Sequence, residues 1–446
     1  MPQRIVAIGA APTSLGFAYR LHELQQEGSK EANDVELIEA VPGGLSCTVT
    51  DEAGFLWDMG GHITFSHNFP YYEKATRWAV DEWNSLQRNC LVDMNYLFDK
   101  RGIHLVPYPA QFAERYESPP QNTPENFEEW ILNHFGPTIL DCFFKPYTRK
   151  VWTVDTAKMS PNWVGTRVAK LPQEKLESLC AMDPEELEAT SVQKADFGWG
   201  PNASFSFPKY GGTGAVWKQM AGKLPQKWFR YESRVVAVDP KAKSVRYVVG
   251  KGADEKLVRE TRICPELNLE HNKVFIVGVG LKLPMPESMQ PFTWLYFPDP
   301  NVPFYRVTFL SRYGEVTPDS SKYWSVMCEC ARTPDDKTTA EEIRDLAVEG
   351  LITKSIIQRE QIVSVYYTTL PYGYPIPTVQ RDSELTRAHR ALESQSIYSR
   401  GRFGGWKYEV SNQDHCFIQG KELADRLVLD IDEKLYRTGI VAEKRG

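Results

Sequence analysis

Three stretches of the chain together supply arginines and tyrosines, and this combination is suited to phosphate binding. The stretches are Trp294–Arg306, Tyr372–Pro375 and Arg400–His415. An arginine offers a charged fork of donors, and a tyrosine hydroxyl adds a neutral donor beside it. A run of charges is ordinarily a solvated face, but the glycines and aromatic residues between Arg402 and Tyr408 favour a binding site here.

Two further stretches combine basic, aromatic or glycine residues. Phe143–Trp152, with Arg167 farther on, carries basic residues that for any single position are better read as a solvated helix end. Pro42–Ser46 and Asp58–His67 contain paired glycines, which allow a flat ligand to approach the backbone closely. A tight turn between two strands is the alternative explanation of those glycines.

Other catalytic motifs are missing from the sequence. It contains no H-E-x-x-H, G-x-S-x-G or G-x-x-x-x-G-K-[ST] pattern. His62 and His67 stand five residues apart in a segment without helical periodicity, so we expect no zinc site and no other metal.

The N-terminal residues predict a β-α-β unit that would position one of these sites. Arg4–Ile8 is a β-branched run, Pro12–Gln26 has helical periodicity, and Val35–Ile38 is a second strand that ends at Glu39. An acid at this place reaches a ribose hydroxyl in dinucleotide-binding folds. The G-x-G-x-x-G fingerprint keeps Gly9, but Ala11 and Ser14 replace the next two glycines, so a purely structural unit remains an alternative.

The rest of the chain divides into a helical and a strand-rich part. A helix is expected from about Thr123, with a stop and restart at Gly136-Pro137, and residues 160–190 are also amphipathic. Alternation of apolar and polar residues indicates half-buried strands. One helix is expected between them, and residues 239–262 are expected to form an exposed hairpin or loop. The strands are Trp294–Phe297, Tyr305–Leu310, Tyr323–Cys330 and Gln361–Thr368, and the helices are Thr339–Thr353 and, near the end, about Phe417–Leu429.

Composition narrows the function classes. The 446 residues carry a formal net charge of −6, which argues against a general nucleic-acid or anionic-membrane binder. The longest apolar run, Val274–Leu281, is too short to span a bilayer. Eight scattered cysteines without a C-x-x-C pair, and an N-terminus without a secretory signal pattern, predict reduced thiols in a cytoplasmic protein. The 12 Trp, 21 Tyr and 21 Phe fit either large cores or sites for planar ligands.

The sequence resembles the UDP-galactopyranose mutase family, and within it the eukaryotic, fungal-like branch. The resemblance covers nearly the whole chain in family order. It is carried by PGGLS at 42–46, GGHITFSH at 60–67, VPYPAQ at 106–111, KPYTRKVW at 145–152, WGPNASFSFPKYGGTG at 199–214, WLYFPDPNVPFYR at 294–306, YGYPIPT at 372–378 and SRGRFGGWKYEVSNQDH at 399–415.

The resemblance implies a flavoenzyme that interconverts UDP-galactopyranose and UDP-galactofuranose without net redox change. In the family the FAD must be reduced, its N5 forms an adduct with the sugar, and eukaryotic members take electrons from NADPH. Arg88 matches a residue near the nicotinamide donor. The implied partner is the sugar nucleotide, with a homo-oligomer as a further expectation and no nucleic acid or membrane span.

The resemblance also implies the site residues. Arg167 and Arg306 would hold the diphosphate with Tyr296, Tyr313, Tyr374 and Tyr408, while His62, Arg402 and Asn412 would lie near the flavin and the sugar. These cations and hydroxyls would stabilise the charge that grows on the leaving diphosphate. Phe65, Trp152 and Asn202 match the galactose and mobile-loop side of the substrate pocket, and Tyr108, Gln111 and Phe143 match the uracil pocket. Trp294 is a further expected substrate-binding residue. The FAD contacts implied are Gly9, Ala11, Thr13, Ser14, Glu39, Gly43, Gly44, Leu45, Gly60, Gly61, His62, Arg402, Ser411, Asn412 and Gln413.

The fold expected is α/β with interleaved domains. It comprises a discontinuous Rossmann-like FAD-binding domain (1–88, 203–265 and 400–446), an inserted helical domain with a mobile substrate loop (110–202), and an antiparallel β-sheet domain (89–109 and 266–399).

Two other functions remain open. The chain departs from the family pattern at Ala11, Ser14, Ala110 and Thr148 and in the short 260–272 stretch. The departures at Ala11, Ser14 and 260–272 motivate a sugar-nucleotide binder that has lost FAD. A flavin oxidoreductase of amine-oxidase-like fold is the other alternative, although its substrates have no use for a diphosphate clamp.

Overall fold

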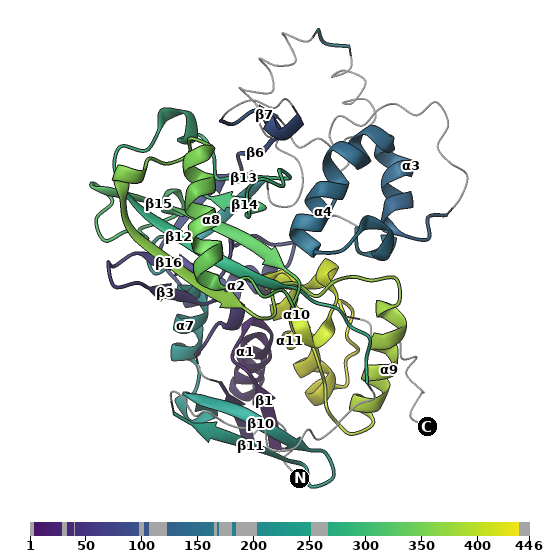
Figure 1. Ribbon diagram of the computed structural model, residues 1–446. Coiled ribbons are helices and arrows are strands. Elements are labelled where there is room, and N and C mark those ends of the chain that lie inside the picture. Colours follow the sequence, from purple (N-terminus) through teal and green to yellow (C-terminus); the bar gives the residue numbers. More distant parts are fainter. Residues whose placement is uncertain are drawn as a thin grey trace.

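The computed structural model describes residues 4–28, 34–39, 41–97, 102–106, 123–164, 167–168, 181–183, 203–250 and 266–436. A large sheet with α8 across one face occupies the upper left of Figure 1, and α3 and α4 lie beside it. The N-terminal β1 and α1 lie below the sheet next to the C-terminal α11. The mixed α/β class expected from the sequence is therefore confirmed, whereas the domain boundaries stay a prediction.

The N-terminal β-α-β unit forms as the sequence predicts. Strand β1 (Arg4–Ile8) pairs in parallel with β2 (Asp34–Ile38), and α1 (Pro12–Gln26) connects them. Pro12 opens the helix, where its missing N–H would have no acceptor in any case. The predicted apolar face of α1 is fully buried, and β9 (Phe229–Arg230) extends the sheet beyond β2.

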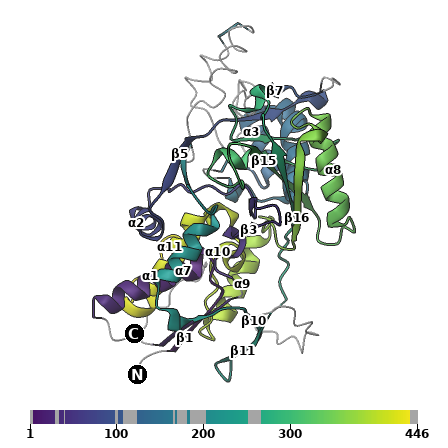
Figure 2. The same cartoon turned by 90° about the vertical axis from the view of Figure 1, so that its left-hand side faces the viewer.

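Helix α11 (Gln413–Leu429) packs tightly against α1. A Cβ on Gly16 would lie 2.1 Å from the Phe417 carbonyl oxygen, and one on Gly420 would lie 1.9 Å from the Thr13 carbonyl oxygen. Both glycines therefore let the two backbones touch. The helix begins four residues before the predicted Phe417, so the predicted helix end at Leu429 is confirmed but the start is not. Helices α2 (Pro70–Ala79) and α7 (Gly214–Lys223) complete this layer, which Figure 2 shows from the side.

The large sheet has seven strands in the order β16-β12-β15-β14-β13-β6-β7. Its pairs are antiparallel except β13 with β6, which run parallel, so the expected antiparallel sheet needs that one correction. The strands are β6 (Cys90–Asp93), β7 (Leu105–Val106), β12 (Lys273–Lys282), β13 (Trp294–Tyr296), β14 (Arg306–Thr308), β15 (Tyr323–Arg332) and β16 (Ile362–Leu370).

The prediction of half-buried strands is wrong for the centre of this sheet. Residues Trp324–Ala331 of β15 are all buried, because both faces of the sheet are covered. One face packs against α8 (Ala340–Thr353), with Cys328 and Cys330 in that core. The other face packs against aromatic residues from β4, α3 and α4, and Met327 belongs to that second core. A side chain on either face of β15 is therefore screened from bulk water.

The helical part follows the predicted stop and restart. Asn126 caps α3 (Phe127–Ile139), three residues after the expected start at about Thr123, and Gly136 with φ +82° breaks the helix before Pro137. A π-helical turn (Leu140–Phe144) then leads into α4 (Lys145–Trp152). For 160–190, the described residues contain only a 3₁₀ turn at Pro161–Trp163, and the remainder lies outside the described ranges.

The remaining elements are short and lie around the large sheet and the parallel unit. The predicted exposed hairpin is β10 (Ser233–Asp239) with β11 (Ser244–Val249), while residues 251–262 lie outside the described part. Among the described residues, no helix has both the length and the apolar character needed to cross a bilayer. The other elements are β3 (Thr48–Thr50), β4 (Leu56–Asp58), β5 (Trp83–Gln87), β8 (Ser204–Pro208), α9 (Arg381–Glu393) and α10 (Gly401–Gly405).

Candidate active site

One large cavity joins the N-terminal β-α-β unit to the seven-stranded sheet. Its volume is about 1920 Å³, well above the roughly 300–1,000 Å³ of an ordinary small-ligand pocket. Most of the site residues predicted from the sequence line it. They are Gly9, Ala11, Thr13, Ser14, Gly43, Leu45, Gly60, Gly61, His62, Phe65, Arg167, Trp294, Tyr296, Arg306, Tyr374, Arg402, Tyr408, Ser411, Asn412 and Gln413.

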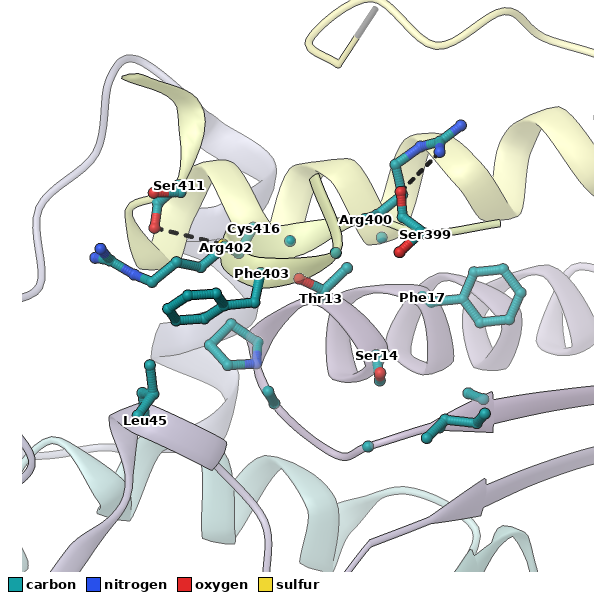
Figure 3. Close-up of a pocket in the computed structure, with 18 of the residues that line it drawn as sticks. Thr13, Ser14, Phe17, Leu45, Ser399, Arg400, Arg402, Phe403, Ser411 and Cys416 are labelled. Atoms are coloured by element: carbon teal, nitrogen blue, oxygen red, sulfur yellow. Dashed lines mark hydrogen bonds between the residues drawn. The ribbon is translucent and has the colours of Figure 1, made fainter. Parts of the chain in front are cut away.

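The end of the cavity near β1 is built as an anion site. Gly9 has φ +103°, a conformation that disfavours a side chain, and it turns the chain from β1 into α1. The N–H groups of Thr13 and Ser14 are in the first turn of α1 and have no intrahelical acceptor, so the positive end of the helix dipole faces the cavity. Figure 3 shows both residues at this helix start, with Phe403 beside them.

Glycines at other positions take over the packing roles of the two missing fingerprint glycines. The Ala11 methyl group fits against Gly44, because a Cβ on Gly44 would lie 2.9 Å from the Ala11 Cβ. The neighbouring Gly43 has φ +111° and donates its N–H to the Ala10 carbonyl at 2.9 Å, which fastens the 43–46 turn to the β1 loop. The alanine at position 11 is therefore accommodated by the glycine at position 44. Close packing of α1 depends on Gly16, two residues beyond Ser14.

Glu39 and Gly44 lie just behind the cavity wall. The Glu39 carboxylate accepts the Ala10 N–H at 3.1 Å, so it supports the same loop from the end of β2. Neither residue belongs to the lining, although both touch residues that do.

The opposite end of the cavity is centred on a buried ion pair between neighbouring strands. Arg306 on β14 lies opposite Glu329 on β15 in the sheet register. The guanidinium donates from Nη2 to Glu329 Oε1 at 2.8 Å and from Nε to Oε2. Burial acts to raise the pKa of Glu329, but the Arg306 charge and these hydrogen bonds outweigh it and hold that pKa low. The carboxylate is therefore ionised at neutral pH.

Glu329 lines the cavity but was not among the predicted site residues. It also accepts the Gly61 N–H at 3.3 Å and the Tyr305 hydroxyl at 3.2 Å. One feature of the sequence could have indicated Glu329 as a site residue: it is the one charged residue inside the buried run Trp324–Ala331. A buried arginine on a neighbouring strand requires such a partner.

The paired glycines at 60–61 make room for this ion pair. A Cβ on Gly61 would lie 2.7 Å from Thr308 Oγ1 and 3.2 Å from the Arg306 Cζ, and a Cβ on Gly60 would lie 3.2 Å from Glu329 Oε1. The close approach predicted for these glycines therefore includes the Arg306 side chain. Next to them, the buried His62 Nδ1 has no hydrogen-bond partner in the described part of the protein. Burial, followed by the Arg402 and Arg306 charges, lowers the pKa of His62 to about 4, so its ring is neutral at pH 7.

Arg402 is a cation without an acidic partner among the described residues. Its guanidinium lies 5.3 Å from the centre of the Tyr374 ring and 5.6 Å from that of Tyr408. The buried Nη1 atom has no hydrogen-bond partner in the described ranges. Aromatic faces attract the cation without neutralising it, so its charge remains available to an anion in the cavity.

Arg167 reaches the same wall from the helical side. Its Nη1 donates to Asn412 Oδ1 at 2.5 Å, and its Nη2 donates to the carbonyls of Tyr408 and Glu409. Burial lowers the pKa of Arg167, although the group stays cationic at pH 7. Arg167, Arg306 and Arg402 therefore lie on one cavity, and among the described residues only Arg306 of the three forms an ion pair with a carboxylate, that of Glu329.

Tyrosine hydroxyls complete this wall. Burial raises the pKa of Tyr296 and of Tyr374, which keeps both as O–H donors at neutral pH. Tyr305 was not predicted as a site residue. Its hydroxyl bonds to Glu329 and lies 3.5 Å from the Tyr374 hydroxyl, so it connects the ion pair to the tyrosines.

Some predicted substrate residues lie outside the cavity lining. Tyr313 is fully buried and donates its hydroxyl to the Thr293 carbonyl at 3.2 Å. Phe143 is buried in the helical layer and stacks on Tyr147. Trp152 packs edge-on against Tyr408 and so supports the wall from behind. Tyr108, Gln111 and Asn202 lie outside the described residues.

One group of side chains in the described part has donors grouped closely enough for a metal ion. His67, Asp414 and His415 offer ligand atoms within 4.8 Å of one another. His67 Nδ1 is hydrogen-bonded to Asp414 Oδ2 at 2.8 Å across 347 residues of sequence, which explains why spacing did not reveal the group. The nearby Arg167 and the N-terminus of α11 make the local field positive and disfavour a cation. We interpret the group as a hydrogen-bonded His–Asp pair.

Known proteins share this architecture. No family model matches the sequence. A solved structure of reduced UDP-galactopyranose mutase matches with a TM-score of 0.82 and 31% identity, over 98% of this chain and 97% of that one. An Exiguobacterium protein described as a protoporphyrinogen oxidase (TM-score 0.66, 14% identity, 96% and 99% of the two chains) shares the fold alone. So does a cyclohexylamine oxidase from Brevibacterium oxydans (TM-score 0.59, 13% identity, 96% and 99%).

The first match is distinguished from the others by its identity and not only by its shape. An identity of 31% is sustained across nearly the full length of both proteins. The chain therefore belongs to the UDP-galactopyranose mutase family.

Proposed function

We propose that this protein interconverts UDP-galactopyranose and UDP-galactofuranose, with reduced FAD as its cofactor. The observation that carries the proposal is the group Arg167, Arg306 and Arg402 on one large cavity, of which only Arg306 forms an ion pair with a carboxylate among the described residues. A sugar diphosphate leaving group supplies the negative charge that such a set would neutralise.

The residues present fit FAD. The α1 N-terminus and the Gly9 turn suit the diphosphate of a dinucleotide, and the 43–45 turn continues the same cavity. The neutral His62 ring and the unpaired Arg402 Nη1 lie farther along it. We therefore propose that Thr13, Ser14, Gly43, Leu45 and the Ser411–Gln413 segment hold the cofactor. When bound and reduced, FAD supplies the nucleophile for the anomeric carbon of the sugar.

The protein groups would act mainly on the departing diphosphate. Negative charge grows on its oxygens as the bond to the sugar breaks, and donors already aimed at that position lower the barrier. Arg306 is held in place by two strands and by Glu329, and so would not need to reorganise during the step. Tyr296, Tyr374 and Tyr408 add hydroxyl groups near the same wall.

Flavin-dependent oxidation in the manner of amine oxidases is the second candidate, because a cyclohexylamine oxidase shares the fold. The arginine set weighs against it, since an amine substrate would be repelled by uncompensated guanidinium groups. For a homologue without FAD, the accommodation of Ala11 by Gly44 removes one of the motives.

Other features of the proposal follow from the family resemblance. We propose NADPH as the electron source with Arg88 near its site, membership of the eukaryotic branch, a cytoplasmic location and a homo-oligomer. The substrate roles of Tyr108, Gln111, Phe143, Trp152, Asn202 and Tyr313 belong to the same proposal.

The decisive experiment compares the reduced and oxidised forms of the purified protein. The absorption spectrum should show bound flavin, and dithionite-reduced protein given UDP-galactofuranose should yield UDP-galactopyranose on chromatography. The oxidised protein serves as the matched control and should be inactive. If flavin is bound and reduced but no product forms, the mutase proposal is wrong. Bleaching of oxidised flavin by an amine would instead support the oxidase.

A further inference from the structure

The turn that carries Tyr408 and Asn412 is held from behind by a residue outside the cavity. This 3₁₀ turn (Tyr408–Val410) presents the Tyr408 ring and the following Asn412 to the cavity. The side chain of Glu409, between them, points instead toward α9, where it meets Arg381. Neither Glu409 nor Arg381 belongs to the cavity lining.

Arg381 binds the Glu409 carboxylate through both terminal nitrogens of its guanidinium. Nη1 donates to Glu409 Oε2 at 2.8 Å and Nη2 donates to Oε1 at 2.7 Å, which is a two-pronged pair. Nε and Nη2 also bind Asp382 Oδ1 at 3.0 and 2.9 Å. Burial acts to lower the pKa of Arg381, but the Glu409 charge and its hydrogen bonds raise it overall.

Without its partners, the buried Arg381 side chain at the start of α9 would be energetically unfavourable. Its side chain is 1% exposed, and it is the first residue of α9, where the helix dipole disfavours a cation. Removing such a charge from water is expensive unless its partners compensate fully. The start of a helix does not by itself favour an arginine. The ion pair between Arg381 and Glu409 therefore requires another explanation.

The same turn receives Arg167 on its other side. The Glu409 carbonyl accepts from Arg167 Nε at 3.2 Å and from Nη2 at 2.9 Å, and the Tyr408 carbonyl accepts from Nη2 at 3.0 Å. The Arg167 guanidinium also lies 5.0 Å from the centre of the Tyr408 ring. Glu409 is therefore held by Arg381 through its side chain, and it holds Arg167 through its main chain.

We propose that Arg381 is a positioning residue that fixes the 408–412 turn and, through it, sets where Arg167 meets an anion in the cavity. The identity of that anion as the UDP diphosphate rests on the proposed function. The placement of Arg167 does not, because it follows from hydrogen bonds within the protein.

Three variants separate positioning from a general loss of stability. Arg381→Lys keeps the charge but loses the fork. Arg381→Met with Glu409→Met removes both charges of the pair together, which is far less damaging than leaving one of them without its partner. Arg387→Met is the matched control, because Arg387 lies on the same helix with an exposed ion pair to Glu384.

The measurement is the affinity for UDP, by displacement of a fluorescent UDP analogue, with flavin content and thermal melting recorded for each variant. We expect about a 10- to 100-fold loss of affinity in Arg381→Lys and in the double methionine variant, as when a supporting contact is removed behind a binding group. The control should bind as the wild type does. In an Arg167→Met background the Arg381→Lys change should have little further effect, because both act through one group.

A second readout needs no ligand. Trypsin must take the Arg167 side chain into its own pocket, so a docked guanidinium protects the Arg167–Val168 bond. Cleavage there, followed by mass spectrometry, should accelerate in Arg381→Lys and in the double methionine variant but not in Arg387→Met.

Several results would overturn the inference. Wild-type UDP affinity in a folded double methionine variant would show that the Arg381–Glu409 pair does not position Arg167. Additive losses with Arg167→Met would show that Arg381 acts through another group. If the wild type fails to bind UDP, the proposed function fails, whereas unchanged cleavage after Arg167 in the variants refutes the positioning role.

Discussion

Replacing Arg306 by alanine should cost the protein stability as well as activity, because the substitution strands a buried carboxylate. Glu329 is 2% exposed and receives four hydrogen bonds, two of them from the Arg306 guanidinium. After the change only the Gly61 N–H at 3.3 Å and the Tyr305 hydroxyl at 3.2 Å would remain. Breaking one side of a buried pair typically costs about 3–5 kcal/mol, and we expect a loss of that size at pH 8.

The loss should depend on pH with a definite sign. In the wild type the pKa of Glu329 is held low, so its contribution to stability exists above the unfolded pKa of about 4.3 and is lost on acidification. Without Arg306, burial dominates and raises that pKa above the unfolded value. The variant's Glu329 then contributes stability at low pH that is lost as pH rises. The difference between variant and wild type should therefore shrink as the pH falls from 8 toward 5.

Urea unfolding of the flavin-free protein at pH 8 and pH 5 measures this difference, and turnover of the reduced holoenzyme measures the catalytic part. Arg306→Ala should lower kcat/KM by about 100- to 1,000-fold, as when a single preorganised donor is lost. Adding Glu329→Gln should restore most of the stability, since no charge is then stranded, but should not restore turnover. Equal stability of the single and double variants at both pH values would refute the reasoning about Glu329.

Three further outcomes are expected. Burial raises the pKa of Asp58 to about 6, above its unfolded value of about 3.9, so the wild type should gain about 2 kcal/mol of stability relative to Asp58→Asn as the pH falls from 6 to 4, as urea unfolding of the two proteins would show. Gly61→Ala would place a methyl group 2.7 Å from Thr308 Oγ1 and 3.2 Å from the Arg306 Cζ, so both kcat/KM and the melting temperature should fall; normal turnover would contradict the packing described. Gly44→Ala, at φ +54° and 2.9 Å from the Ala11 methyl, should lower flavin content, and adding Ala11→Gly should recover part of it, as absorbance would show.

Local signals in the sequence were sufficient for the β-α-β unit and for four strands of the large sheet, β13 to β16, but not for β12, β6 and β7. The apolar period of α1 and the β-branched residues of β1 are properties of the segments themselves, and the structure confirms both. Arg306, Arg402 and His62 could be proposed because each lies in a motif with glycine or aromatic neighbours.

The remaining features depend on contacts between distant segments. Glu329 acquires its role from the pairing of β14 with β15, and the burial of both faces of β15 follows from packing that no alternation pattern reveals. The compensation between Ala11 and Gly44, and the pairing of His67 with Asp414, likewise join residues that spacing cannot connect. Tyr313 had the residue type of a site tyrosine, yet its hydroxyl is directed to a main-chain carbonyl in the core.

The contact between α1 and α11 has a consequence for folding during synthesis on the ribosome. Arg20 and Asp425, which form an ion pair at 2.7 Å between these helices, are 405 residues apart in the chain. At roughly 5–20 residues per second, about 20–80 s separate the synthesis of the two helices. During that time the apolar face of α1 and the exposed backbone at Gly16 lack the partner they have in the finished structure. The cavity end next to β1 can close only after α11 has emerged, so chains that stall or end before α11 should be retained by chaperones and should not bind the cofactor.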